Sequence, residues 1–273
     1  MTLYNSKKIK IMNFNSSNAP LCVITTTETG SMGRNISPEY KNRKKIMELL
    51  GIEKIFYLKQ EHTDIVFDSK EIDNNSIVGD GIITSEKKAI AVTVADCLPI
   101  FLNDPEKSVY GIVHSGWKGT GIVLNAIKKM AICYGTKPED VHVIIGPSIG
   151  KCCYSVDKER ALSFAAKWGE DTVSLREFQS ESQSEFQSES RTEPPSFRCK
   201  TESIVPQVHL GERREPQYFL DLKKANKLML ERAGVKNIII DENCTCCNKE
   251  FHSYRRDGAE GFGLMLALIG YFG

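Results

Sequence analysis

The stretch that decides the fold reads Ser108-Val109-Tyr110-Gly111-Ile112-Val113-His114-Ser115-Gly116-Trp117-Lys118-Gly119. Its first half predicts a strand that ends at His114, and the glycine-flanked turn after it predicts the start of a helix. The apolar residues of that helix share one face, because they recur at spacings of four, three and four: Val123, Ile127, Met130 and Tyr134. A further strand is expected over residues 141–145. Such a β-loop-α-β unit favours parallel pairing of its two strands, with functional groups at their carboxyl ends.

On both sides of this unit the chain continues to alternate between strand and helix signals. Strands are expected over residues 54–58, 81–84, 89–95 and 235–240. Helices are expected from Pro38, with Ser37 as N-cap, to Leu50, from Asp157 to Trp168, and from Asp221 to Gly234. The pattern predicts a mixed α/β fold, in which a β-sheet core is flanked by about five helices.

Residues 177–190 contain a polar near-repeat, Glu177-Phe178-Gln179-Ser180-Glu181-Ser182-Gln183-Ser184 followed by Glu185-Phe186-Gln187-Ser188-Glu189-Ser190. Such a composition buries too little apolar surface to offset the entropy of ordering the chain. We therefore expect a single domain over residues 1–273, with a flexible surface insertion at about 176–215.

Composition excludes several classes of protein. The 273 residues carry 36 Lys+Arg against 35 Asp+Glu, a net charge of +1, which gives no electrostatic reason to expect a nucleic acid or an anionic membrane as partner. The nine cysteines are odd in number and irregularly spaced, and no signal-peptide pattern precedes them. We expect a cytoplasmic protein whose cysteines are thiols or metal ligands. The apolar tail at 261–273 is too short to span a bilayer and is expected to be a buried terminal element.

Three residues with metal-binding side chains, His62, Cys97 and His114, each fall near the end of a strand-like run. One thiolate and two imidazoles form a ligand set that suits zinc, and three protein ligands leave the fourth position open, as in catalytic zinc sites. Their separations of 35 and 17 positions are too wide to indicate a site by spacing alone. The shared position at strand ends is what predicts a joint metal site.

Two carboxylates accompany the three ligands. Asp96 adjoins Cys97, and Asp80 lies in the Gly79-Asp80-Gly81 turn, so either could orient an imidazole or act as general base. A zinc ion would lower the pKa of its bound water to ~7. The same residues also allow a metal-free nucleophile, in which His114 activates Cys97. Asp80 could equally be a plain turn residue.

Anion binding has two candidate residues. Residues 254–258 read as a polar turn that carries two arginines, and Arg255 could hold phosphate with two hydrogen bonds. Lys118 lies in a glycine-rich turn where a helix begins, a second candidate. Residues 254–258 could equally form a solvated turn with an Arg–Asp pair.

The remaining cysteines and the histidine count bear on further metal sites. Cys244-Thr245-Cys246-Cys247 could join Cys152, Cys153 or Cys199 around a second metal, but adjacent cysteines are poor joint ligands, so free thiols are expected. A multicopper oxidase needs on the order of ten histidines. This chain has five, so copper chemistry is expected only from copper in the single site.

Several blocks, in fixed order, resemble the YfiH/YlmD-like family: Gln60-x-His62, Gly79-Asp80-Gly81, Ala95-Asp96-Cys97-x-Pro99, Val113-His114-x-Gly116-Trp117-Lys118-Gly119, Ile145-Gly146-Pro147-x-Ile149-Gly150, Cys153-Tyr154, Cys244-Thr245 and Phe251-x-Ser253-Tyr254-Arg255-Arg256-Asp257-Gly258. Bacterial members were labelled polyphenol oxidases or laccase-domain proteins and are now described as purine nucleoside phosphorylases. The resemblance spans nearly the whole chain.

What the resemblance implies is a fold similar to the catalytic domain of cytotoxic necrotizing factor, with zinc, or copper in the same site, held by His62, Cys97 and His114. It implies phosphorolysis of adenosine, inosine and methylthioadenosine, with deamination of adenosine as a companion activity. Gln60, Lys118 and Arg255 become candidate substrate-binding residues. The expected partners are a nucleoside and phosphate, and the expected state is a monomer or homodimer.

One departure from the family pattern follows the arginine block. Relatives usually continue with Thr, Gly and Arg, whereas this chain reads Ala259-Glu260-Gly261-Phe262, so Glu260 replaces the Thr and Phe262 replaces the Arg. The departure puts activity or specificity in question, and it is the sequence support for a non-enzymatic binding protein. Two enzymatic functions besides phosphorolysis are also compatible with the sequence: a metal-free cysteine amidohydrolase acting on a cell-wall precursor, and a copper-dependent phenol oxidase.

Overall fold

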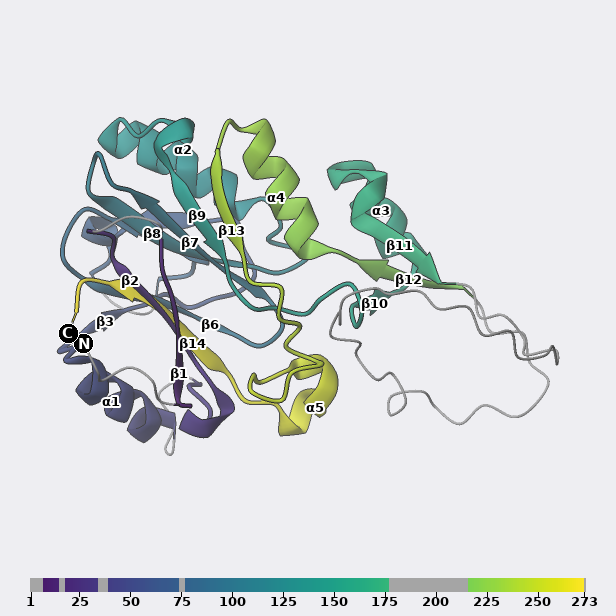
Figure 1. Cartoon of the computed structure of the whole chain (residues 1–273), viewed down its shortest axis with the longest axis horizontal. Helices are drawn as coiled ribbons and strands as arrows, with labels where there is room; N and C mark the ends of the chain where they lie inside the picture. Colours follow the sequence, from purple (N-terminus) through teal and green to yellow (C-terminus); the bar gives the residue numbers. More distant parts are fainter. Residues whose placement is uncertain (1–6, 15–17, 34–38, 74–76, 177–215, 273) are drawn as a thin grey trace, which may run out of the picture.

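The computed structural model describes residues 7–14, 18–33, 39–73, 77–176 and 216–272. Within them, two β-sheets are stacked face to face, and helices cover the outer face of each (Figure 1). The mixed α/β fold with helices on a β-sheet core is therefore confirmed. The N-cap residue Ser37 and Pro38 of the first expected helix lie outside the described residues.

The larger sheet has six strands in the order β13-β9-β7-β8-β5-β4. Their bounds are β13 Asn237–Ile240, β9 His142–Ile145, β7 Leu98–Asp104, β8 Val109–Ser115, β5 Gly81–Thr84 and β4 Val66–Asp68. β8 and β9 flank the predicted crossover helix, yet they do not pair with each other, so the expected direct pairing is wrong. β7 lies between them and pairs antiparallel with both, because a short turn joins β7 to β8 as a hairpin.

The smaller sheet has five strands in the order β1-β2-β14-β6-β3. Their bounds are β1 Ile9–Met12, β2 Leu21–Thr25, β14 Met265–Gly270, β6 Ala89–Val94 and β3 Ile55–Phe56. The apolar tail expected to be a buried terminal element forms β14, in which every residue is buried. β14 pairs antiparallel with β2 and β6, so the two ends of the described chain share this sheet.

Alternate residues along each strand enter different layers of core, as the two-residue period of a strand requires. In β14, Met265, Ala267 and Ile269 face the space between the sheets. Leu266 and Leu268 face the helix α1 (Glu39–Leu50) on the other side. Strands of both sheets are therefore buried on two faces, which is why their sequences are nearly continuous apolar runs.

Three further helices cover the six-stranded sheet. α2 (Ile122–Tyr134) and α4 (Leu222–Arg232) lie along its outer face, and α3 (Lys158–Trp168) packs beside them (Figure 1). Asp157 and Asp221 cap α3 and α4, as predicted, by accepting hydrogen bonds from the backbone N–H groups of Arg160 and Lys224.

A three-stranded sheet, in the order β10-β12-β11, accompanies α3. It consists of β10 Ser155–Val156, β12 Gln217–Leu220 and β11 Val173–Arg176. β11 and β12 pair antiparallel, with Arg176 opposite Gln217. Residues 177–215 of the expected insertion lie outside the described residues, and the segment joins two strand ends that are hydrogen-bonding partners.

Residues 254–258, predicted as a polar turn, begin a helix instead. α5 runs from Tyr254 to Gly261, and the Ser253 side chain caps it by accepting from the backbone N–H of Arg256. Gly258, at a φ of 73°, kinks it. The serine cap was the signal that the sequence interpretation missed.

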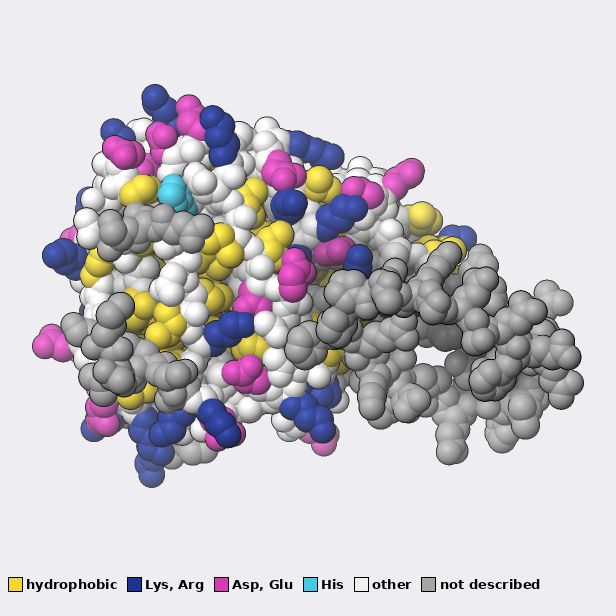
Figure 2. All heavy atoms as spheres, in the orientation of Figure 1, with side chains coloured by type: hydrophobic (Ala, Val, Ile, Leu, Met, Phe, Trp, Pro, Cys, Tyr) yellow, Lys and Arg dark blue, Asp and Glu magenta, His cyan; other side chains and the backbone are white. Residues whose placement is uncertain are grey.

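In the described part of the chain, no helix combines the length and the apolar character needed to cross a membrane. Basic and acidic side chains are interspersed over the face shown in Figure 2.

Candidate metal centre

Asp80 is the residue around which the two histidines of the predicted site are arranged. Its carboxylate is fully buried. It accepts hydrogen bonds from the backbone N–H groups of Glu61, His62 and Thr63 at 3.2, 3.1 and 2.7 Å, and from Thr63 Oγ1 at 2.8 Å. It also bonds His114 Nδ1 at 2.7 Å. One carboxylate therefore fixes both the loop that carries His62 and the ring orientation of His114.

The charge of Asp80 follows from these contacts. Burial by itself would raise the pKa of its carboxyl group, but hydrogen bonds from His114 and Thr63 outweigh burial and lower the pKa to about 2. Asp80 is thus a carboxylate at neutral pH and can only accept hydrogen bonds.

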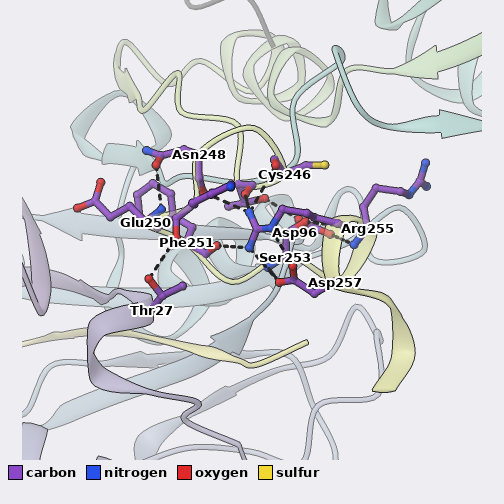
Figure 3. Close-up of polar contacts among 12 residues, drawn as sticks. Thr27, Asp96, Cys246, Asn248, Glu250, Phe251, Ser253, Arg255 and Asp257 are labelled. Carbon is purple, nitrogen blue, oxygen red and sulfur yellow. Dashed lines mark hydrogen bonds and ion pairs between the residues drawn. The ribbon is translucent and has the colours of Figure 1, made fainter. Parts of the chain in front are cut away.

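Asp96 anchors the turn that carries Cys97 between β6 and β7. Its φ is 77°, a left-handed conformation that Asp tolerates better than most residues. Its carboxylate accepts from Thr245 Oγ1 and from the backbone N–H of Arg255, both at 2.6 Å (Figure 3). Its backbone carbonyl accepts from the N–H of Ile149 at 2.9 Å. Two segments distant in sequence are held to the Cys97 turn in this way. The catalytic roles predicted for Asp80 and Asp96 stay predictions.

The structure brings His62, Cys97 and His114 together. Their candidate ligand atoms all lie within 4.8 Å of one another, and Cys97 Sγ is 3.8 Å from His62 Nε2. Because Asp80 occupies Nδ1 of His114, Nε2 of that ring is left for Cys97 or a metal. His114 is buried near the end of β8 and His62 is exposed, so the site opens to solvent on the His62 side.

The ionisation of Cys97 and His114 is linked. Burial opposes charge on both groups, yet the fields and hydrogen bonds of His114 and His62 lower the pKa of the Cys97 thiol to about 6. The Cys97 thiolate and Asp80 raise the pKa of His114 to about 9. Thiolate and imidazolium therefore stabilise each other at neutral pH when no metal is present.

The donor set and its spacing fit a soft or borderline divalent metal. Tetrahedral zinc, with bonds of about 2.0–2.3 Å, places a sulfur and a nitrogen ligand ~3.6 Å apart. The Cys97–His62 separation of 3.8 Å is close to that value. A carboxylate on the far nitrogen of a ligand histidine, as Asp80 is on His114, is the usual partner in such sites.

The backbone at Gly116 passes very close to the side chains of the candidate ligands. A Cβ atom at this position would lie 2.9 Å from Cys97 Sγ and 3.1 Å from His62 Cδ2. Only glycine lets the turn after β8 pass this close to the three side chains.

The family described as multi-copper polyphenol oxidoreductase laccase matches this chain over residues 35–192 and 177–271. The chain belongs to this family. The resemblance to YfiH/YlmD-like proteins predicted from the motif blocks is confirmed.

Two relatives and one solved structure are similar to this chain in sequence or fold. Purine nucleoside phosphorylase YlmD of Geobacillus stearothermophilus is 37% identical over 70% of this chain and 59% of its own length. Purine nucleoside phosphorylase LACC1 of Mus musculus is 30% identical over 84% of this chain and 46% of its own length. The chain thus spans about half the length of these relatives. A crystal structure of the Bacillus licheniformis hypothetical protein YfiH shares the fold, with a TM-score of 0.72, 24% identity and coverage of 92% of each chain.

The three predicted substrate-binding residues lie in different environments. Gln60 bonds residue 93 of β6: its Oε1 accepts from Thr93 N at 2.7 Å and its Nε2 donates to Thr93 O at 2.9 Å. Lys118 is exposed, with its Nζ 5.9 Å from the centre of the Trp117 ring. Arg255 extends away from the network around Asp96 (Figure 3), and its Nη1 donates to Ser155 O at 3.0 Å. Their substrate roles stay predictions.

The sequence interpretation gave no role to two further residues of this family member: Tyr154, which it named only within a motif block, and Arg160. Burial and the negative charge of Cys97 raise the pKa of Tyr154 to about 12, while Arg160 and Arg255 act in the opposite direction. The Arg160 guanidinium also stacks 4.5 Å from the centre of the Trp117 ring. The charges of Arg160, Arg255 and Cys97 therefore all act on Tyr154, and the Arg255 guanidinium lies 5.5 Å from the centre of its ring. Arg160 lies on α3, six residues after the Cys153-Tyr154 block but outside it, so no sequence signal marked it.

The departure from the family pattern has a structural counterpart. Phe262, where relatives usually carry Arg, packs edge-to-face on Tyr254 with ring centres 5.0 Å apart. Glu260 is exposed. An aromatic pair between the first residue of α5 and its C-cap residue therefore stands where relatives usually carry a guanidinium group.

Proposed function

We propose that this protein is a metal-dependent purine nucleoside phosphorylase, which converts a nucleoside and phosphate to the free base and ribose 1-phosphate. The observation that carries the proposal is that His62, Cys97 and His114 converge, and that Asp80 forms a hydrogen bond with His114. The names of the relatives YlmD and LACC1 supply the reaction class. Adenosine, inosine and methylthioadenosine are the proposed substrates.

His62, Cys97 and His114 would hold the metal, with zinc the preferred ion for one thiolate and two imidazoles. Zinc supplies Lewis acidity and lowers the pKa of a bound water to ~7. On that chemistry we propose hydrolytic deamination of adenosine as a companion activity. Copper is the second ion for the same site, as the family description suggests.

The residues of this chain have separable tasks in the proposed reaction. Asp80 keeps a proton on Nδ1 of His114 and so directs the lone pair of Nε2 inward. Arg160 and Arg255 offer guanidinium groups for the phosphate, which they can bind through paired hydrogen bonds. Trp117, stacked on Arg160, limits the positions that this guanidinium can adopt.

The test is a nucleoside panel assayed with and without phosphate, coupled to metal analysis of the same sample. We expect one zinc per chain that is lost in Cys97→Ala, together with phosphate-dependent release of base. Cys133→Ala, which removes an exposed thiol of α2 remote from the site, is the matched control. Full phosphorolysis by Cys97→Ala would overturn the proposal.

A cysteine amidohydrolase is the second candidate, and the pKa of about 6 at Cys97 favours it, because such a thiol is largely thiolate at neutral pH. A cell-wall precursor would be the substrate. Inactivation by iodoacetamide together with indifference to chelators would select this candidate over the phosphorylase. Phenol oxidation only by copper-loaded protein would select an oxidase.

A further inference from the structure

Two loops outside the candidate metal centre bring four cysteine side chains together. Cys152 and Cys153 lie in the loop after β9, and Cys244 and Cys247 in the loop after β13. β9 and β13 are adjacent and parallel, so both loops leave the same edge of the sheet. The four Sγ atoms all lie within 4.8 Å of one another. The sequence analysis named a joint metal site of these cysteines as an alternative but favoured free thiols, because it could not show that these two loops meet.

The spacing of the sulfur atoms matches a metal shell. Cys247 Sγ lies 3.5 Å from Cys152 Sγ and 3.4 Å from Cys153 Sγ. A tetrahedral zinc with four Zn–S bonds of ~2.3 Å places its sulfur atoms ~3.8 Å apart. The four thiols are therefore already gathered at about the size of such a shell. Adjacent cysteines can both contribute here because the turn at residues 150–153 aims both sulfur atoms at Cys247.

A backbone N–H group next to the cluster can stabilise a negatively charged sulfur atom. The N–H of Gly150 donates to Cys244 Sγ at 3.2 Å, a contact that stabilises a thiolate or a metal-bound sulfur. A Cβ atom at Gly150 would lie 3.3 Å from Cys152 Sγ and 3.6 Å from Cys244 Sγ. The loop is thus packed directly against the sulfur atoms.

The surrounding protein holds both loops in place. Arg256 Nη1 donates to the backbone carbonyl of Thr245 at 2.8 Å, and its Nη2 donates to that of Phe251 at 2.8 Å, across the loop drawn in Figure 3. Arg255 Nη1 donates to the carbonyl of Cys153 at 3.3 Å. The buried ammonium of Lys223 donates to the carbonyl of Asn243 at 2.8 Å, beside Cys244. Positive charge is therefore available next to a site that gains negative charge as its thiols ionise.

We propose that Cys152, Cys153, Cys244 and Cys247 bind a second zinc ion as a closed, four-thiolate structural site. Four protein ligands leave no open position, so this ion takes no part in chemistry. Binding displaces the four thiol protons and joins the loop after β9 to the loop after β13. The proposal is independent of nucleoside activity, because it concerns a ligand set that shares no residue with the candidate metal centre.

The experiment counts zinc in the full-length protein, purified under reducing conditions and desalted. We expect two zinc ions per chain in the wild type and one in Cys97→Ala. The double variant Cys152→Ser/Cys247→Ser is expected to retain one zinc and to unfold at a Tm several degrees lower. Cys133→Ser, at an exposed thiol outside both sites, is expected to keep two.

Cobalt substitution of Cys97→Ala distinguishes the outcomes even where the double variant fails to fold. We expect the strong visible absorption and sulfur-to-cobalt charge-transfer bands of a tetrahedral thiolate site. A Cys97→Ala protein with neither zinc nor these cobalt bands would overturn the proposal. So would the finding that the reduced protein binds no metal at this cluster, while oxidation by dissolved oxygen links Cys247 to Cys152 or Cys153 in a disulfide that mass spectrometry detects.

Discussion

The candidate metal centre and the four-cysteine cluster are both built from ligands that suit zinc, yet they differ in origin and in the number of ligands. The first takes single residues from three segments, includes two imidazoles, and is open to solvent at His62. The second takes two cysteines from each of two neighbouring loops, includes the exposed Cys247, and lies beside the backbone N–H of Gly150 and the Arg256 side chain. An open three-ligand set suits chemistry and a closed four-thiolate set suits structure. Asp96 links the two regions, since its turn carries Cys97 and its carboxylate holds Thr245 and Arg255.

Removing ligands from one region at a time should separate function from stability most strongly. Cys97→Ala is expected to lower kcat/KM for phosphorolysis by about 10³-fold or more, because a metal supplies several kcal/mol to such a reaction. Its Tm should fall by less than that of the double variant, since loss of any metal bound only by the folded protein lowers stability. Cys152→Ser/Cys247→Ser should show the larger fall in Tm, with retained turnover. Kinetics and thermal denaturation of both variants measure this, and equal loss of activity in both would break the comparison.

Asp80→Asn tests whether the orientation of His114 matters for the first site alone. We expect a loss of roughly 10–100-fold in zinc affinity or activity, the usual cost of removing a partner of a ligand histidine. Zinc in the four-cysteine cluster should be unaffected, and Asn can keep part of the hydrogen bonding to residues 61–63. Competition with a chelator gives the affinity. If the zinc affinity is unchanged, Asp80 serves only as a turn residue and does not orient His114 for metal binding.

Without metal, Cys97 should respond to pH differently from an ordinary thiol. The Cys97 thiol, with a pKa lowered to about 6, is protonated below that value and is a thiolate above it. Alkylation of Cys97 by iodoacetamide in metal-free protein should therefore rise through a midpoint near pH 6, compared with ~8.5 for an ordinary thiol. Peptide mass spectrometry resolves each cysteine. A midpoint above 8 at Cys97 would contradict the thiolate–imidazolium pair.

Asp96→Asn distinguishes an anchor from a general base. If Asp96 only holds Thr245 and Arg255, kcat should fall a few-fold, Tm should drop and the shape of the pH profile should persist. If Asp96 is a general base, the substitution should instead remove the acidic limb of the pH profile of kcat. The pH dependence of kcat, measured beside the Tm of the same variant, decides between them.

Phe262→Arg is expected to have the smallest effect. It removes the ring pair with Tyr254, worth about 0.5–1.5 kcal/mol at most, at a partly exposed position. Urea denaturation should show a change within that range. If the departure from the family lowers phosphate affinity, KM for phosphate should fall in the variant while kcat holds. A rise in KM would show that the aromatic pair itself favours the substrate.

Local patterns predicted the elements whose period and caps are complete in the sequence. β5 matches the expected residues 81–84, and α3 and α4 begin after their predicted aspartate caps. Direct pairing of β8 with β9 was wrong because β7 forms a hairpin with β8 and enters between them. Which strands become neighbours depends on contacts far apart in sequence, and no local period encodes them.

The sequence by itself determined the family, the mixed α/β class and the residue types of a soft-metal site. These depend on motif order, periodicity and side-chain chemistry, all of which are local properties. Only the tertiary structure decided that Asp80 holds both histidines, that Arg160 joins Arg255 beside Tyr154, and that Cys152 meets Cys247 across 95 positions. The first and third of these are contacts between segments that separate strands deliver to one edge of a sheet, while Arg160 and Arg255 are carried by the helices α3 and α5. Such contacts exist only when the sheets have formed, because side-chain chemistry specifies what can bind and the packing of the strands specifies which side chains meet.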